Sequence, residues 1–176
     1  VRRFETDAGA MIHFGNAWEN GNEIIVDGMF TDNFEANKTL NDVFNPNGRF
    51  GGGTYMRYRL NVETGGLTRE QVCQTESEFP TFNTTWTGRR NDVTWTACSV
   101  PNGANSFFNA IQRITHEGDA TLLELPKGLY GSEPLYAQSS NAKQEDDGYV
   151  LEVVYNGFTH RSQLQIYRAN DMAQVS

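Results

Sequence analysis

The chain has 176 residues, a formal net charge of −8 and a sequence pI of about 4.8. This length fits one domain with a sizeable core. The acidic balance argues against a nucleic-acid partner, since phosphates would be repelled. The sequence contains no run of eighteen apolar residues, so no transmembrane helix is predicted. Membrane association otherwise stays open.

The N-terminal residues and the two cysteines indicate the processing and the redox state of the chain. The first residues, "VRRFETDAGA", lack both a starting Met and the apolar core of a signal peptide, so we expect a truncated or processed piece. Cys73 and Cys98 have no metal-ligand spacing. A sparse cysteine pair of this kind predicts two reduced thiols in a cytosolic protein.

Paired strand patterns recur along the whole chain. Residues 12–30, "IHFGNAWENGNEIIVDGMF", predict a hairpin whose Asn20-Gly21 turn favours type I′. Residues 54–62 alternate with period two, and 68–77 can return antiparallel. The alternation sets Met56, Tyr58, Leu60 and Val62 against Tyr55, Arg57 and Arg59.

The second half repeats this pattern. Residues 106–115 and 120–126 flank the turn "HEGD", and residues 147–156 and 162–170 form a further pair. One short helical turn is expected at 39–44 and a surface loop at 45–53. The chain is therefore predicted to be a single all-β region over 1–176, as a sandwich, a barrel or propeller blades.

The three histidines lie in different contexts. His116, in "THEGD", and His160, in "GFTHRSQ", occupy polar turns and are predicted to face solvent. His13 instead follows Met11 and Ile12. Such a ring is either a hydrogen-bonded core side chain or a metal ligand, and these residues alone leave both interpretations open.

Several carboxylates also call for an explanation. Glu78 directly precedes Phe79-Pro80, and Glu133 directly precedes Pro134. A carboxylate entering an apolar strand needs a partner, or else faces water at a sheet edge. The stretch 144–148, "QEDDG", lacks the ligand spacing of an EF-hand and is predicted to be a solvated turn.

Taken together, the motifs resemble one known family. "HFGNAWENGNEIIVDG" is similar to the segment around the third iron-binding histidine of the carotenoid cleavage oxygenases, which include lignostilbene dioxygenases and the retinal pigment epithelium isomerase. "SEFPTFN" resembles that family's Glu-Phe-Pro segment. Residues 131–172 are similar to its Glu-Pro, Glu-Asp-Asp-Gly and final-blade strands. The matches fall in the family's order over nearly the whole chain.

The resemblance implies a seven-bladed β-propeller with a non-haem Fe(II) on its axis, of which this chain would form about the last three blades. In that family four histidines hold the iron, and three glutamates hold three of those histidines. By motif, His13 corresponds to one ligand, and Glu78 and Glu133 to two of the glutamates. Many members have a His-His pair where this chain has His13-Phe14.

The resemblance also implies dioxygen-dependent cleavage of a carbon–carbon double bond in a carotenoid, apocarotenoid or stilbene. The first two ligand histidines would lie upstream of this chain and the fourth beyond Ser176, so the isolated chain is expected to be inactive. Open propeller edges predict self-association or pairing with the missing blades. Apolar lining of a substrate tunnel is expected from Phe14, Trp18, Phe79 and Phe82.

The alternative function is a non-catalytic β-rich binding or scaffold domain, with His13 in the core and both glutamates in solvent. Convergence of His13, Glu78 and Glu133 would favour the oxygenase. A hydrolase that uses two carboxylates ranks last, because no sugar-binding pattern accompanies them.

Overall fold

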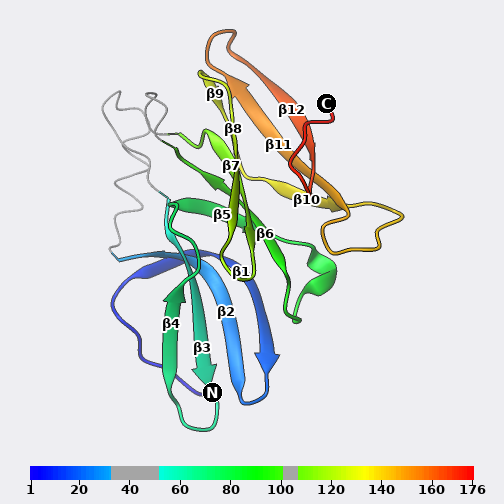
Figure 1. The fold of residues 1–176 in the computed structure, drawn as a ribbon. Coiled ribbons are helices and arrows are strands. Elements are labelled where there is room, and N and C mark those ends of the chain that lie inside the picture. Colours follow the sequence, from blue (N-terminus) through cyan, green and yellow to red (C-terminus); the bar gives the residue numbers. More distant parts are fainter. Residues whose placement is uncertain (33–51, 101–106) are drawn as a thin grey trace.

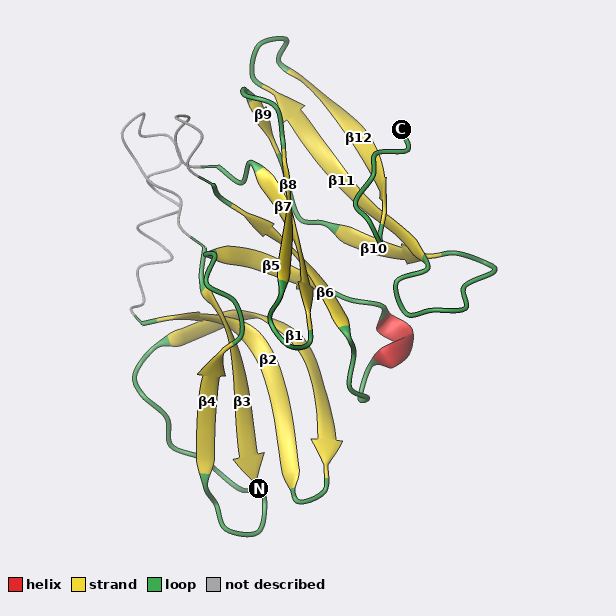
Figure 2. Cartoon of the chain, viewed as in Figure 1, coloured by secondary structure: helices red, strands yellow, loops and turns green. Residues whose placement is uncertain are grey.

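The computed structural model describes residues 1–32, 52–100 and 107–176. Strands dominate these residues, and the short 3₁₀ helix η1 (Thr84–Trp86) stands out among them (Figure 2). The strands form three four-stranded antiparallel sheets that follow one another in chain order (Figure 1). The all-β class is confirmed. The partial seven-bladed propeller stays a prediction, because three consecutive sheets define no ring.

Each sheet is built from neighbouring strands. The first sheet contains β1 (Ala10–Asn20), β2 (Glu23–Thr31), β3 (Thr54–Asn61) and β4 (Leu67–Gln71). The second contains β5 (Ser77–Thr81), β6 (Val93–Cys98), β7 (Ala110–Thr115) and β8 (Ala120–Glu124). The third contains β9 (Leu129–Tyr130), β10 (Leu135–Gln138), β11 (Gly148–Asn156) and β12 (Arg161–Arg168).

The second sheet lies between the other two, and each of its faces packs on a neighbour. Towards the first sheet, Ile114 joins a buried cluster with Met29, Tyr55 and Cys73. Towards the third sheet, the buried cluster comprises Val93, Trp95, Ile111, Val150, Tyr167, Ala169 and Met172. Period-two alternation explains how one sheet supplies apolar rows to two interfaces.

The hairpin between β1 and β2 forms as predicted, but its turn is shifted by one residue. Asn20 pairs with Glu23, so the loop residues are Gly21 and Asn22. Gly21 has a φ of 60°, whereas Asn20 and Asn22 have no positive φ. A glycine with positive φ at the first loop position is typical of a type II′ turn, so the type I′ prediction was wrong.

The acidic stretch "EDDG" includes the predicted turn, but its side chains are half-buried and hold the second and third sheets together, so only the solvated part of the prediction was wrong. The Glu145 carboxylate accepts hydrogen bonds from the backbone N–H groups of Asp92 and Val93 at 2.8 and 3.0 Å. Asp146 pairs with Arg113 at 2.6 Å. Asp147 accepts two backbone N–H groups within its own turn. Each carboxylate therefore has a partner that fixes the loop.

Some expectations fall outside what the structure describes. The helical turn at 39–44 and most of the loop at 45–53 lie outside the described residues. Within those residues, no helix has the length and apolar character needed to cross a membrane. Cys73 and Cys98 are both buried as free thiols, and burial raises the pKa of the Cys98 thiol to about 12.

Candidate functional site

His13 of β1 and Glu78 of β5 meet across the boundary between the first two sheets. The His13 Nδ1 atom lies 2.8 Å from Glu78 Oε2. The Glu78 side chain is only 13% exposed, while the His13 side chain is 39% exposed. A carboxylate accepts a hydrogen bond, so Nδ1 of the neutral ring carries the proton and Nε2 has a free lone pair.

Both residues lie beside irregularities in their strands. The register of β1 against β2 shifts between Met11 and Phe14, and again between Phe14 and Ala17. The register of β5 against β6 shifts between Glu78 and Thr81. An extra residue in one strand re-aims the neighbouring side chains. These bulges explain how His13 and Glu78 turn towards each other from different sheets.

Phe79 has a strained backbone conformation inside the β5 bulge. Its φ is 56°, a left-handed conformation that is costly for a residue with a side chain. The Phe79 ring lies against the His13 ring, with centroids 4.7 Å apart. Its backbone N–H also donates to Glu78 Oε2 at 3.3 Å. Phe79 therefore contacts both members of the His13–Glu78 pair.

Gly53 allows the start of β3 to approach β5 closely. Gly53 and Ser77 exchange two backbone hydrogen bonds of 2.9 Å. A Cβ atom at residue 53 would lie 3.3 Å from Glu78 Oε1 and 3.1 Å from the Phe30 carbonyl oxygen. A larger residue would therefore press on the Glu78 carboxylate.

Glu133 does not join this pair. It is exposed and lies just before β10, the first full strand of the third sheet. His13 and Glu78 lie on the first strands of the two preceding sheets. Glu133 therefore lies before a strand and after β9, whereas His13 and Glu78 lie within the first strands of their sheets. Among the described residues, no group of three or more His, Cys, Asp or Glu side chains could by itself hold a metal ion.

The four aromatic residues predicted to line a tunnel lie in different surroundings. Phe79 contacts His13 and packs edge-on against Phe108, with centroids 5.7 Å apart. Trp18 is buried beside the His116 ring, and Phe82 is half-buried. Phe14 is 61% exposed and lines a separate pocket of about 320 Å³ with Phe4 and Phe30. Among the described residues, Phe79 is the one of the four whose ring packs on the His13 ring, and the tunnel itself stays a prediction.

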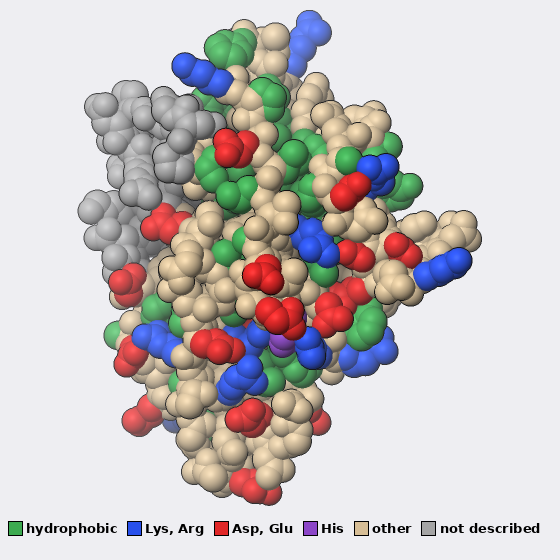
Figure 3. Space-filling view, in the orientation of Figure 1, with side chains coloured by type: hydrophobic (Ala, Val, Ile, Leu, Met, Phe, Trp, Pro, Cys, Tyr) green, Lys and Arg blue, Asp and Glu red, His purple; other side chains and the backbone are tan. Residues whose placement is uncertain are grey.

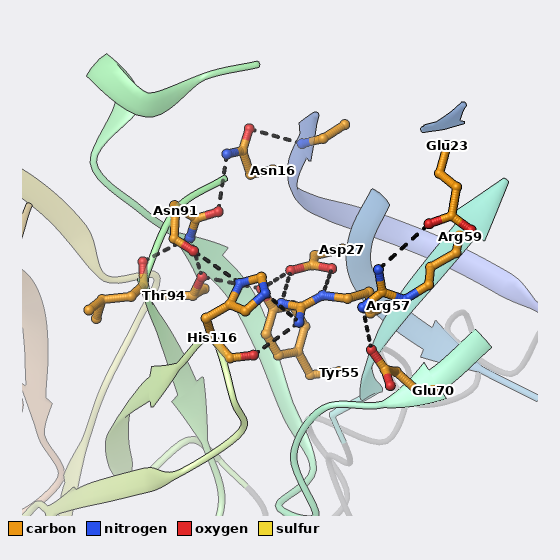
Figure 4. A network of polar contacts seen from close by, with 12 residues as sticks. Asn16, Glu23, Asp27, Tyr55, Arg57, Arg59, Glu70, Asn91, Thr94 and His116 are labelled. Atoms are coloured by element: carbon orange, nitrogen blue, oxygen red, sulfur yellow. Dashed lines mark hydrogen bonds and ion pairs between the residues drawn. The ribbon is translucent and has the colours of Figure 1, made fainter. Parts of the chain in front are cut away.

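The other two histidines differ in their exposure to solvent. His160 is exposed, as predicted, and its Nδ1 lies 2.7 Å from the Tyr155 hydroxyl. His116 was predicted to face solvent, which was wrong. Its ring packs on Trp18 and hydrogen-bonds to Arg57 and to the Asn91 carbonyl (Figure 4). Burial and the nearby Arg57 charge lower the pKa of His116, so the ring is neutral near pH 7.

The chain has the fold of solved oxygenase structures. It matches the crystal structure of cobalt-substituted Synechocystis ACO with a TM-score of 0.83 and 22% identity, covering 97% of this chain and 36% of that one. It matches the crystal structure of an ACO/RPE65 chimera with a TM-score of 0.82, 23% identity and the same coverage. At these identities the likeness establishes a shared fold.

Sequence comparison identifies the family. Apocarotenoid-15,15'-oxygenase of Synechocystis sp. is 24% identical over 174 residues, which are 98% of this chain and 36% of that protein. Carotenoid 9,10(9',10')-cleavage dioxygenase 1 of Arabidopsis thaliana is 23% identical over 193 residues, covering 98% of this chain and 34% of that protein. The family model for retinal pigment epithelial membrane protein matches residues 1–176. The chain belongs to this family of carotenoid oxygenases, which confirms the resemblance seen in the motifs.

The chain spans about a third of the length of these relatives. The site fits a single metal contact from this part of the protein. His13 offers a neutral imidazole with a free Nε2, and its Nδ1–H has a carboxylate acceptor. This is the usual arrangement of a histidine that binds a transition metal.

Proposed function

We propose that residues 1–176 form part of a non-haem Fe(II) dioxygenase. Its reaction would cleave one carbon–carbon double bond with O₂ and give two carbonyl products. Each oxygen atom of O₂ ends in one product, so no other oxidant is needed. The observation that carries the proposal is the His13–Glu78 hydrogen bond, with Nε2 of a half-exposed ring left free.

In this proposal His13 contributes one iron ligand through Nε2, and Glu78 fixes the ring orientation. A bound Fe(II) would supply the position where O₂ is activated beside the substrate. Glu78 keeps the proton on Nδ1 and makes the ring a stronger ligand. The cobalt-substituted relative supports a transition-metal site in this fold.

Glu133 takes an equivalent role towards another histidine. It precedes the first full strand of the third sheet, as Glu78 lies on the first strand of the second. Its exposure leaves the carboxylate accessible to a ring from outside residues 1–176. We assign the remaining ligands to the longer protein of which this chain would form about a third.

The substrate is an apolar conjugated molecule: a carotenoid, an apocarotenoid or a stilbene. The Phe79 ring lies against His13 and Phe108 packs on Phe79, and these aromatic rings suit such a molecule better than a charged one. The names of the sequence relatives support a carotenoid-type substrate.

The test compares the isolated chain with the longer protein. Each is incubated with Fe(II), O₂ and an apocarotenoid or a stilbene, and the carbonyl products are measured. The longer protein should cleave at least one substrate, and the 176-residue chain should cleave none. Absence of cleavage by the longer protein, or turnover by the isolated chain, would reject the proposal in its present form.

A further inference from the structure

A buried polar cluster connects the first and second sheets beside the bulged part of β1 (Figure 4). We call it the inter-sheet cluster. Apart from His116, which is partly buried, its members have almost no exposure. The inter-sheet cluster consists of Asn16, Asp27, Tyr55, Arg57, Asn91 and His116.

Arg57 is the link between the sheets. Its Nε and Nη2 atoms donate to the two carboxylate oxygens of Asp27, each at 2.9 Å. Its Nη1 atom donates to the His116 carbonyl oxygen at 2.9 Å. Asp27 and Arg57 lie on β2 and β3, whereas His116 follows β7 of the second sheet. The bidentate geometry fixes the guanidinium in one orientation.

Asn16 ties β1 itself to the second sheet. Its Nδ2 atom donates to the Arg89 carbonyl oxygen at 2.7 Å and to Asn91 Oδ1 at 3.1 Å. Its Oδ1 atom accepts the Gly88 N–H at 3.3 Å. Asn16 lies in the bulge between Phe14 and Ala17, where the pairing of β1 with β2 is interrupted. The bulge is therefore held by side-chain bonds to the loop before β6.

The position of Asn16 matters for His13. The two residues are three positions apart on one strand, about 10 Å at the usual rise. The partner of His13, Glu78, lies on the second sheet. A hydrogen bond tolerates a shift of only a few tenths of an ångström. Any slide of the first sheet on the second would consequently change the distance between His13 Nδ1 and Glu78.

We propose that Asn16 and Arg57 are positioning residues: through the inter-sheet cluster they hold His13 Nδ1 against Glu78 and keep Nε2 free. The value of a free Nε2 rests on the proposed function. Neither residue touches iron or substrate in this role, because both act through the docking of one sheet on the other.

The test measures the protonated nitrogen of the His13 ring in the metal-free 176-residue chain. Nitrogen-15 NMR at about pH 8, where an ordinary histidine is neutral, distinguishes the two tautomers. In Arg57→Gln and Asn16→Ala we expect the ratio of the Nδ1–H to the Nε2–H tautomer to fall at least about threefold, or about 0.6 kcal/mol. Glu78→Ala, which removes the acceptor, should give a change at least as large.

Arg59→Gln is the matched control. Arg59 lies two residues from Arg57 on β3, and it pairs with Glu23 and Glu70 near the surface (Figure 4). Its loss should leave the His13 tautomers unchanged. A folded Arg57→Gln or Asn16→Ala chain with the wild-type tautomer ratio would overturn the proposal. Tyr55→Phe, which removes one hydroxyl from the cluster, decides the matter if both of these variants unfold.

The two proposals fail in different ways. The tautomer measurement involves no metal, so an unchanged ratio rejects the positioning role and leaves the iron proposal standing. A longer protein that binds no iron rejects the proposed function, even where the tautomers respond as expected.

Discussion

His13 and Glu78 belong to different sheets, yet their side chains meet at 2.8 Å beside three strand irregularities. The bulges in β1 and β5 turn both side chains towards the same boundary. The inter-sheet cluster and the His13–Glu78 pair together join the first and second sheets in two places. The candidate site is thus a product of how the two sheets dock.

Loss of the Glu78 charge should weaken metal binding by the longer protein. Glu78→Gln keeps a hydrogen-bond acceptor but removes the negative charge that strengthens His13 as a ligand. We expect iron affinity to fall about 10- to 100-fold, measured by competition with a chelator. Glu76→Gln, an exposed change two residues upstream, is the control and should have no such effect. Equal affinities of the two variants would contradict the role of Glu78.

The strained backbone at Phe79 predicts an unusual order of stabilities. Ala and Gly both remove the ring, but Gly adopts a φ of 56° without steric cost. Phe79→Gly should therefore be about 1 kcal/mol more stable than Phe79→Ala. Chemical denaturation measures the difference. At Phe82, whose φ is not positive, the order should be reversed. The same order at both positions would argue against strain at Phe79.

A carboxyl buried between the second and third sheets should make stability depend on pH. Glu152 is 1% exposed, and neither of its carboxylate oxygens has a hydrogen-bond partner in the described residues. Burial raises the pKa of Glu152 from the ordinary 4.5 to about 8. The folded state favours the protonated form of Glu152. The contribution of this residue to the free energy of unfolding is therefore highest below pH 4.5 and falls as the pH rises to about 8.

Glu152→Leu should remove this pH dependence. The difference between the two pKa values corresponds to roughly 5 kcal/mol as an upper figure. We expect the variant to gain stability over the wild type as the pH rises from 4.5 to 8. Urea unfolding at each pH measures this difference. Glu124→Gln, an exposed change on β8, serves as the control. Parallel pH profiles of Glu152→Leu and the wild type would show that Glu152 does not titrate in this range.

The outer face of the third sheet should cause self-association of the isolated chain. Apolar side chains gather over the region of β8, β11 and β12 (Figure 3). Val153 and Leu164 pair across β11 and β12 and are about half exposed. Such a patch favours association. Light scattering should give a mass above 19.8 kDa.

A charge on this face should reduce the association. Val153→Lys should lower the measured mass, whereas Thr68→Lys, an exposed change on β4 of the first sheet, should not. A monomeric wild-type chain at high concentration would contradict the prediction. Equal effects of the two variants would place the association elsewhere.

The sequence predicts the strands of this fold better than their faces. Period two identified β3 but did not indicate which of its two rows packs on another sheet. The structure buries Tyr55 and Arg57 against the second sheet, and Tyr58 of the other row is buried as well. The burial of Arg57 can be predicted only when its partner is known, and that partner, Asp27, is thirty positions away in the sequence. Local patterns contain no information about that pairing.

For the same reason, only part of the candidate site could be predicted from the sequence. Motifs singled out His13 and Glu78 individually, but their contact depends on sheet docking and on bulges that alternation does not reveal. Phe108 and the inter-sheet cluster were missed, since their roles arise from contacts between distant segments. Glu145 was misread because its carboxylate accepts hydrogen bonds from backbone N–H groups at the start of β6, on another sheet.

Iron content measured in the longer protein tests the central claim most directly. We expect about one iron per chain in the wild type and in His160→Ala, whose imidazole is exposed away from Glu78. His13→Ala should lose most of the iron while its folded spectrum is retained. A folded His13→Ala protein with the wild-type iron content would contradict the assignment of His13 as a metal ligand.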